Sequence, residues 1–207
     1  MQHDYHADAV RRLYDGMAAE YAVRFGAELT EQDSDTEFLD AALADLPAGP
    51  VLDLGCGPAQ VSRYLLGLGR VPVGIDIAPA MLAAAARLVP RARLIAADLT
   101  ELPLRPASCA AAVASYSLHH LPVARLGAAL AGLREVLVPG GILVIITHGG
   151  SGEEWLDEHG VPLSRHSPAE LAARVEAAGL RPELVGSRPP RPGEFPADKV
   201  RLSARRE

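Results

Sequence analysis

The sequence predicts a doubly wound α/β fold, in which helices cover both faces of a mostly parallel sheet. Three observations predict it. Short β-prone runs alternate with stretches whose apolar residues recur every three or four positions, as on one face of a helix. Most of the β-prone runs are apolar on both faces, which is typical of strands covered by helices on each side. The last two runs have only a proline-rich link between them, so we expect them to pair antiparallel.

Two helices are expected before the sheet begins. From Tyr5 to about Gly26 the apolar residues share one helical face; they are Val10, Leu13, Met17, Tyr21 and Phe25. A second helix is expected from Ser34 to Leu46, because Pro47 and Gly49 then interrupt the pattern. Together these helices are expected to form an N-terminal cap over residues 1–46.

Five strands and three helices are expected to alternate over residues 50–148. The expected strands cover 51–55, 71–77, 92–98, 109–117 and 141–148. The expected helices cover 60–68, 79–88 and 123–137. Alternation of this kind implies parallel strands joined by right-handed crossovers.

The C-terminal part, residues 167–207, opens on a strong helix signal. Ser167, Pro168 and Glu170 form a capping-box sequence, and Gly179 is expected to end that helix. The antiparallel hairpin is expected at 182–187 and 199–204. Residues 149–166, which precede the helix, are interpreted as a polar loop that could close as a lid or be a plain surface loop.

Composition and charge argue against several classes of function. The 207 residues carry a formal charge of −6 and mostly scattered arginines, which give a nucleic-acid backbone little to bind. No apolar stretch approaches the roughly 20 residues of a membrane helix. Cys56 and Cys109 lie far apart without metal-site spacing, so we expect reduced thiols and no bound metal. We therefore expect a cytoplasmic protein with one domain over residues 1–207, as a monomer or homodimer.

A glycine turn after the first expected strand indicates a nucleotide-like cofactor. The sequence VLDLGCGP, residues 51–58, runs from a buried strand through a Gly-x-Gly turn into a helix. A dinucleotide site would have a third glycine where Gln60 stands, and Asp53 would repel a diphosphate. Asp53 instead favours a cofactor with an amino group and a cationic sulfur, as in S-adenosylmethionine. The alternative is that Asp53 only caps the turn.

Acidic residues also stand at the ends of the next two expected strands. Asp76 lies about twenty residues past the turn, where a carboxylate can accept both ribose hydroxyls of a nucleoside. Asp98 is placed to accept the adenine amino group, while Leu99 and Met81 cover the ring. Each acid alone could be a solvated strand end, but three at consecutive strand ends favour a binding site.

These residues resemble the class I S-adenosylmethionine-dependent methyltransferases, particularly small bacterial members related to the ubiquinone and menaquinone methylases. The resemblance rests on VLDLGCGP, GIDIAPAML, AADLTELPL, VASYSLHHLP and REVLVPGGILVI, in that order. It implies a Rossmann-like, seven-stranded sheet whose last strand is inserted antiparallel. It also implies a first helix that folds over the cofactor, with a tyrosine near its methionine part. The cofactor-binding residues expected are Tyr14, Tyr21, Asp53, Gly55, Cys56, Gly57, Gln60, Asp76, Ile77, Met81, Ala97, Asp98, Leu99 and Ser115.

The residues that follow the fourth and fifth strands are the candidates for a catalytic base, because acceptors bind at carboxyl strand ends in such sheets. Tyr116, His119, His120 and His148 are all plausible, with His148 preferred and at least one of the two adjacent histidines expected to shape the loop instead. Arg165 could pair with an acceptor carboxylate or phosphate. The expected acceptor is a small molecule, methylated on oxygen, nitrogen or carbon.

Three other functions are open to this pattern. An enzyme of the same fold could use the cofactor in a non-methylating reaction, such as a cyclisation or decarboxylation. The chain could also be a module that binds the cofactor without turnover. A nicotinamide-dependent oxidoreductase is disfavoured by Gln60 and Asp53.

Overall fold

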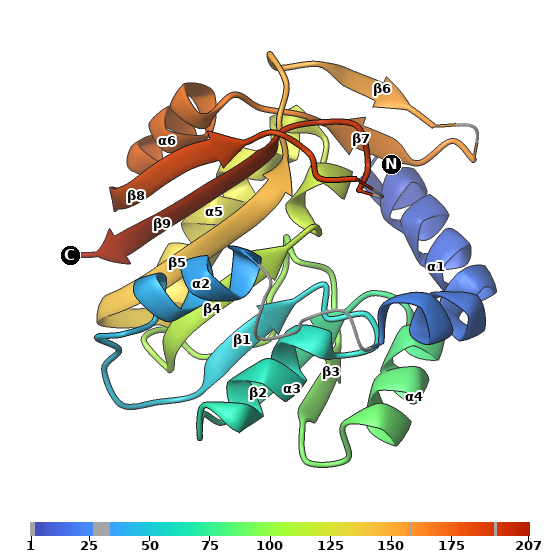
Figure 1. The fold of residues 1–207 in the computed structure, drawn as a ribbon, viewed down its shortest axis with the longest axis horizontal. Coiled ribbons are helices and arrows are strands. Elements are labelled where there is room, and N and C mark those ends of the chain that lie inside the picture. The colour runs from blue at the N-terminus through green and yellow to red at the C-terminus, as the bar shows by residue number, and fades with distance from the viewer. Residues whose placement is uncertain (1–2, 27–33, 158, 193) are drawn as a thin grey trace.

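The computed structural model describes residues 3–26, 34–157, 159–192 and 194–207 and contains a seven-stranded sheet (Figure 1). Its strand order is β3-β2-β1-β4-β5-β9-β8. These strands are β1 (Val51–Leu54), β2 (Pro72–Asp76), β3 (Arg93–Ala96), β4 (Cys109–Ser115), β5 (Leu137–His148), β8 (Leu180–Arg188) and β9 (Lys199–Arg206).

The first five strands are parallel, and β9 lies antiparallel between β5 and β8. The predicted mostly parallel Rossmann-like sheet with an antiparallel C-terminal hairpin is therefore confirmed. Strands β2 and β3 lie on one side of β1, whereas β4 and β5 lie on the other. The connections therefore change direction between β1 and β4, and ligands of such sheets bind in the crevice at the carboxyl ends of these two strands.

Helices cover both faces of the sheet. They are α1 (His3–Phe25), α2 (Ser34–Ala42), α3 (Gln60–Gly67), α4 (Pro79–Leu88), α5 (Val123–Val136) and α6 (Pro168–Ala177). On one face, α5 and α6 bury leucines and valines against residues such as Leu52 and Leu143. On the other, α2 and α3 pack on residues such as Val51 and Val144. Helix α1 contacts α4 along the side of the molecule (Figure 1).

Helix α6 begins and ends where its sequence predicts. The Ser167 side chain accepts from the Glu170 backbone N–H, and the Glu170 carboxylate accepts from the Ser167 N–H, which completes the capping box. After the helix, Gly179 adopts a φ of +80°, a conformation that glycine adopts without steric strain.

Most predicted boundaries agree with the structure to within two residues, and two differ by four. Helix α2 ends at Ala42 rather than Leu46, and residues 43–45 form a turn that leads toward Pro47. Strand β5 begins at Leu137 rather than Gly141, because Leu137 already pairs with Cys109 ahead of an irregularity in the ladder.

The segment 149–166, predicted as a polar loop, contains secondary structure that was not predicted. Strands β6 (Glu154–Leu156) and β7 (Pro162–Ser164) form a separate antiparallel pair there. Strands of three residues are too short to show an alternating pattern in the sequence. A short helical turn, η1 (Leu118–His120), was likewise not predicted. None of the helices within the described ranges has the length and apolar character needed to span a membrane.

Candidate active site

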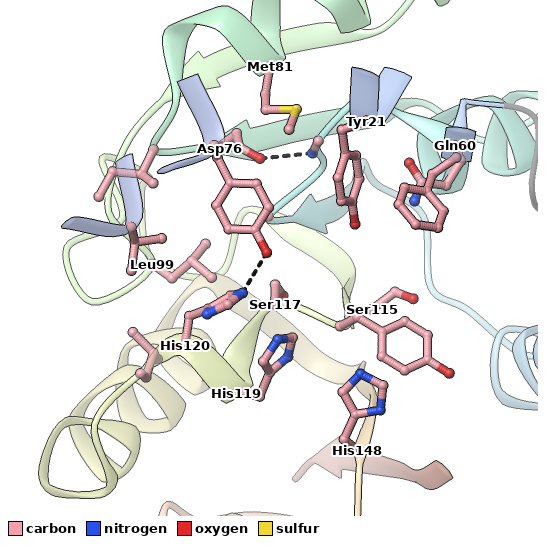
Figure 2. A pocket seen from close by; sticks show the side chains of 18 of the residues that line it. Tyr21, Gln60, Asp76, Met81, Leu99, Ser115, Ser117, His119, His120 and His148 are labelled. Atoms are coloured by element: carbon pink, nitrogen blue, oxygen red, sulfur yellow. Dashed lines mark hydrogen bonds between the residues drawn. The ribbon is translucent and has the colours of Figure 1, made fainter. Parts of the chain in front are cut away.

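A cavity of about 780 Å³ opens at the carboxyl ends of the parallel strands (Figure 2). Its walls come from α1, the turns after β1 to β5, η1 and the segment that leads into β9. Of the predicted cofactor-binding residues, those that line it are Tyr14, Tyr21, Gly55, Gly57, Gln60, Asp76, Ile77, Met81, Asp98, Leu99 and Ser115. The four candidate bases line it as well: Tyr116, His119, His120 and His148.

The glycine turn after β1 requires glycine. Gly55 has a φ of +64°, and a Cβ added there would lie 2.4 Å from the Cβ of Ser117. Gly57 has a φ of +48°, and its N–H donates to the Asp76 carboxylate at 2.8 Å. The other Asp76 oxygen accepts from the Ala78 N–H at 2.8 Å. Asp76 therefore clamps the turn to the end of β2, and burial raises the pKa of its carboxyl group.

Asp53 is not among the described residues that line the cavity, so its predicted contact with the cofactor's amino group is not supported by this geometry. Its side chain is buried and accepts from the Ser62 backbone N–H at 2.8 Å and the Ser62 hydroxyl at 2.7 Å. Burial raises the pKa of Asp53 to about 7. The alternative role fits better: Asp53 ties β1 to the first turn of α3.

Two other predicted cofactor residues also lie outside the cavity lining. Cys56 is buried with its sulfur against Gly74, where an added Cβ would lie 2.9 Å from it. Ala97 packs against the main hydrophobic core. Both support the binding loops through packing, because their side chains point into the protein.

A narrow apolar slot lies between the ends of β2 and β3. Ile77, Met81 and Leu99 line it, and Met81 is almost fully buried. At its edge one Asp98 oxygen accepts from the Thr100 N–H and hydroxyl, both at 2.8 Å. An apolar slot with a carboxylate at its rim suits a flat base that carries an amino group.

Helix α1 closes one side of the cavity. The Tyr14 hydroxyl lies 2.6 Å from His120 Nε2, and the Asp15 carboxylate accepts from the Ala80 N–H at 2.9 Å. Tyr21 stands edge-on to Tyr14, with ring centroids 5.8 Å apart (Figure 2). These contacts hold α1 to η1 and to the start of α4.

Polar atoms of three residues in the cavity wall outside the ionic groups are buried and have no hydrogen-bond partner among the described residues. They are Oε1 of Gln60, Oγ of Ser117 and Nδ1 of His119. Buried polar groups in native proteins are nearly always hydrogen-bonded. The wall therefore suits a ligand that carries several polar groups.

The adjacent histidines have different surroundings. His120 bonds Tyr14 through Nε2, and its Nδ1 lies 3.4 Å from the Pro162 carbonyl oxygen. Both of its nitrogens are thus engaged, which supports the expectation that one of the pair shapes the loop. Burial lowers the pKa of His120 to about 4. His119 is buried beside it, and burial together with His120 lowers the pKa of His119 well below its usual value.

Tyr116 is a poor candidate for a base. Its hydroxyl donates to the Asp35 carboxylate of α2 at 3.1 Å, and burial together with Asp35 raises its pKa far above neutrality. Its backbone φ of +51° is unusual for a non-glycine residue and turns the ring toward His148. The ring is therefore a wall of the cavity and its hydroxyl is committed to α2.

His148 stands between two aromatic rings at the end of β5. Its ring centroid lies 5.0 Å from that of Tyr116 and 4.7 Å from that of Phe195. Its Nδ1 lies 3.1 Å from the amine of Lys199. Burial and the Lys199 charge lower the pKa of His148 to about 4, so the ring is neutral at pH 7.

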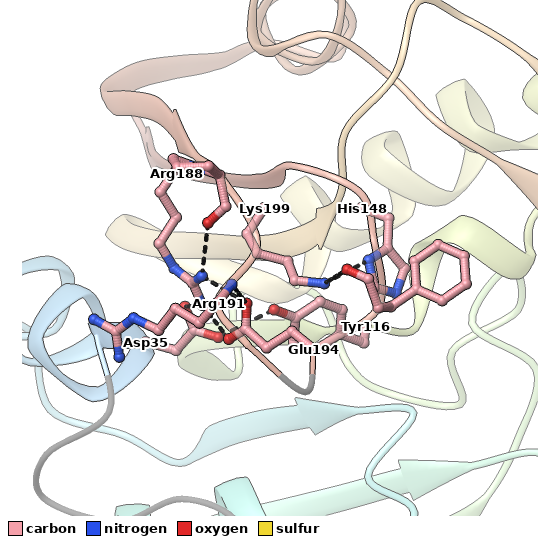
Figure 3. Close-up of polar contacts among 9 residues, drawn as sticks. Asp35, Tyr116, His148, Arg188, Arg191, Glu194 and Lys199 are labelled. Carbon is pink, nitrogen blue, oxygen red and sulfur yellow. Dashed lines mark hydrogen bonds and ion pairs between the residues drawn. The ribbon is translucent and has the colours of Figure 1, made fainter.

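An ionic cluster beside His148 was not predicted (Figure 3). Arg188 donates two hydrogen bonds of 2.7 Å to Glu194 and lies 3.9 Å from Asp35. Arg188 lowers the pKa of Glu194 to about 2. Asp35, Glu194 and Lys199 all line the cavity. The one signal in the sequence was Lys199, the single lysine among 20 basic residues.

Arg165 does not fill its predicted role as a partner for an acceptor anion in this geometry. Its guanidinium lies between the rings of Trp155 and Phe195, 4.7 and 5.3 Å from their centroids. Arg165 is not among the described residues of the cavity wall. It joins the β6–β7 hairpin to the segment that leads into β9.

The sheet order and the strand-end cavity define a Rossmann-like fold with a crevice suited to a nucleoside. The central part of the chain, residues 51–141, matches the family model described as a methyltransferase domain.

Sequence relatives match about half of the chain. An uncharacterized methyltransferase from Synechocystis is 35% identical over 50% of this chain and 49% of its own length. A trans-aconitate 2-methyltransferase from Sinorhizobium fredii is 38% identical over 62% of this chain and 48% of its own length. The chain thus spans about half the length of these curated relatives.

A solved structure matches the whole fold. The 1,6-didemethyltoxoflavin-N1-methyltransferase of Burkholderia thailandensis, solved with bound 1,6-didemethyltoxoflavin and S-adenosylhomocysteine, superposes with a TM-score of 0.81. The match covers 100% of this chain and 90% of that protein, at 24% identity. This likeness concerns the fold.

Proposed function

We propose that this protein binds S-adenosylmethionine and transfers its methyl group to a small-molecule acceptor. The observation that carries the proposal is the shared cavity, whose wall includes the strand-end carboxylates Asp76 and Asp98 as well as the neutral His148. The match of residues 51–141 to the methyltransferase-domain model and the named activities of the relatives support it. We also propose that residues 1–207 act as one domain: a cap at 1–46, a cofactor-binding core at 50–148, a lid at 149–166 and a C-terminal part at 167–207.

The cofactor end would hold the nucleoside. Asp76 would accept the ribose hydroxyls: each of its oxygens already accepts one backbone N–H, and a carboxylate oxygen can accept more than one hydrogen bond. Asp98 would accept the adenine amino group, with Met81 and Leu99 against the ring. The unpartnered Gln60 and Ser117 oxygens would meet the methionine amino group or carboxylate.

The chain's own contribution to the reaction would be alignment and exclusion of water. When bound, the sulfonium supplies an electrophilic methyl group. Tyr14 and Tyr21 of α1 would cover the cofactor, while Tyr116, His148 and Phe195 would orient the acceptor at the other end of the cavity. A displacement of this kind depends chiefly on holding the two reacting atoms close and in line.

Calorimetric titration with S-adenosylmethionine tests the cofactor site. We expect wild type to bind and Asp76→Asn to bind about 10- to 100-fold more weakly, since a hydrogen bond to a charged group contributes about 1.5–3 kcal/mol. Asp45→Asn changes an exposed acid and is the matched control. A wild-type protein that gives no binding signal would exclude the proposal.

Product mass then separates methyl transfer from other uses of the cofactor. With a panel of small acceptors, we expect one product that gains a methyl group together with an equal amount of S-adenosylhomocysteine. A substrate that is converted without gaining mass would instead establish a non-methylating enzyme. Binding with no turnover of any acceptor would favour a binding module.

A further inference from the structure

We propose that Lys199 is a positioning residue that keeps His148 in the tautomer with its proton on Nε2, so that His148 donates a hydrogen bond to the acceptor instead of acting as a base. The role toward the acceptor rests on the proposed methyl transfer, whereas the tautomer itself is a property of the chain alone. The proposal names a residue outside the predicted site and reverses the role expected for His148.

Geometry places the two side chains together. His148 and Lys199 are paired neighbours in the antiparallel ladder between β5 and β9. The Lys199 amine lies 3.1 Å from His148 Nδ1 and 3.2 Å from the Phe195 carbonyl oxygen (Figure 3). Lys199 is only 3% exposed, so water competes little for these contacts.

Charge balance favours the ammonium form of Lys199. Asp35 and Glu194 bring two carboxylates to this cluster, and Arg188 supplies one positive charge. These two carboxylates stabilise the ammonium of Lys199, whereas burial and the charges of Arg188 and Arg165 act in the opposite direction and lower the pKa of Lys199. The amine also lies 5.6 Å from the centre of the Tyr116 ring, within reach of a cation–π interaction.

An ammonium group fixes the tautomer of its neighbour. It has three donors and no acceptor, so His148 Nδ1 must present a lone pair to it. A doubly protonated ring would set two positive charges 3.1 Å apart, and the lowered pKa of His148 agrees with its exclusion. The remaining proton is then on Nε2, and a nitrogen that carries this proton cannot accept another.

The acceptor class follows from this donor. Tyr116 is committed to Asp35, and both nitrogens of His120 are engaged. His119 also lines the cavity, but burial lowers its pKa well below the usual value, which makes it a weak base. An acceptor that needs no deprotonation therefore fits this end best, and the simplest class is a carboxylate. One carboxylate oxygen would accept from His148 Nε2–H. The other would form the new O–CH₃ bond as the C–S bond breaks and its electron pair stays on sulfur, with no proton released.

Nitrogen-15 NMR of the ligand-free protein tests the tautomer directly. Long-range proton–nitrogen correlations report which ring nitrogen carries the proton, and a His148→Gln sample identifies the signals of His148. We expect a protonated Nε2 and an unprotonated Nδ1 across pH 6–8. A protonated Nδ1 in wild type would overturn the proposal whatever the protein binds.

A substitution at Lys199 gives the second arm. In Lys199→Met we expect a mixture of tautomers and a higher His148 pKa, because a positive charge is removed, while Lys199→Arg retains the wild-type tautomer. Arg181→Met removes an exposed cation from β8 and is the matched control. The titratable and charged groups that face His148, and that must be followed in the same titration, are Arg165, His119, His120 and Glu194. An unchanged tautomer in Lys199→Met would overturn the assignment.

Wild type alone decides the charge of Lys199 if the variants fail to fold. Because the sequence contains one lysine, its side-chain ¹³Cε signal needs no assignment. We expect it to titrate above pH 8, as an ammonium group at neutrality. Titration below pH 7 would overturn the proposal.

Activity tests the acceptor class separately. Once cofactor binding is established, we expect carboxylate acceptors to be methylated with a kcat/KM that varies less than threefold between pH 6 and 8, and Lys199→Met to raise KM at least tenfold more than Lys199→Arg does. Methylation confined to phenols or alcohols, with a rate that rises with pH, would overturn it. A protein that binds no cofactor would contradict the methyltransferase proposal, but it would not affect the assignment of the His148 tautomer by NMR.

Discussion

The two ends of the cavity are built from contacts of different range. At the cofactor end, Asp53 and Asp76 bind backbone or side-chain groups only 9 and 19 positions along the chain. At the acceptor end, Tyr116 bonds Asp35 across 81 positions, and Lys199 meets His148 across 51. The turns after β1 and β2 at the first end are encoded by short contiguous motifs, and only α1 reaches that end from far along the chain, through Tyr14 and Asp15 across 106 and 65 positions. The second end exists only when α2, β5 and β9 have assembled.

Gly55→Ala should break the cofactor end and gives the largest expected effect. The new Cβ would clash with Ser117 in a backbone conformation that alanine disfavours, and we expect a loss of about 4 kcal/mol in the free energy of unfolding. Urea unfolding measures it. Gly127→Ala, an exposed site in α5 with no atom within 4 Å of the new Cβ, should be neutral or slightly stabilising. Equal effects of the two changes would contradict the crowding argument.

Arg188→Met should damage the acceptor end alone. It removes the guanidinium that pairs with Glu194 and Asp35, and we expect a loss of about 3 kcal/mol in unfolding free energy. Binding of S-adenosylmethionine should stay within twofold of wild type. If cofactor affinity falls together with stability, the two ends are not independent and the comparison fails.

Asp53→Asn tests the cofactor end through the pH dependence of the free energy of unfolding. The Asp53 pKa is about 7 in the folded state against an ordinary 3.8, so folding takes up a proton between these values. Wild type should therefore lose stability as the pH rises from 4 to 7, at most about 1.4 kcal/mol per pH unit, and the variant should lack this slope. Chemical denaturation at several pH values measures the difference. Asp45→Asn, an exposed acid, should keep the wild-type slope.

Tyr116→Phe gives the smallest effect. It removes the hydrogen bond to Asp35 but keeps the ring beside His148, so we expect about 1 kcal/mol of lost stability and an intact cavity wall. Thermal unfolding at neutral pH suffices. A loss of several kcal/mol would mean that the hydroxyl organises the whole cluster.

The fold and the cofactor end could be predicted because each depends on local patterns. The period of the apolar residues sets the strands and helices, and the Gly55–Gly57 turn with Asp76 is a property of one βαβ unit. Asp53 shows the limit even there, because the sequence does not reveal that Ser62 already occupies its carboxylate.

The acceptor end could not be predicted in the same way. Nothing near His148 in the sequence indicates that a lysine 51 positions later will face its Nδ1. The pairing of β9 with β5 decides that contact, and the register of a sheet follows from the whole assembly rather than from either strand. The hydrogen bond of the Tyr116 hydroxyl could not be predicted for the same reason, because its partner Asp35 belongs to α2.

His120 links helix α1 to strand β7 across the cavity. One of its nitrogens bonds Tyr14 on α1, and the other faces the Pro162 carbonyl on β7, so a single ring touches elements on either side of the ligand space. A molecule that shifts α1 as it enters would alter the support of the β6–β7 hairpin as well. The affinities of the two ligands would then be linked, each changing the other by the same factor.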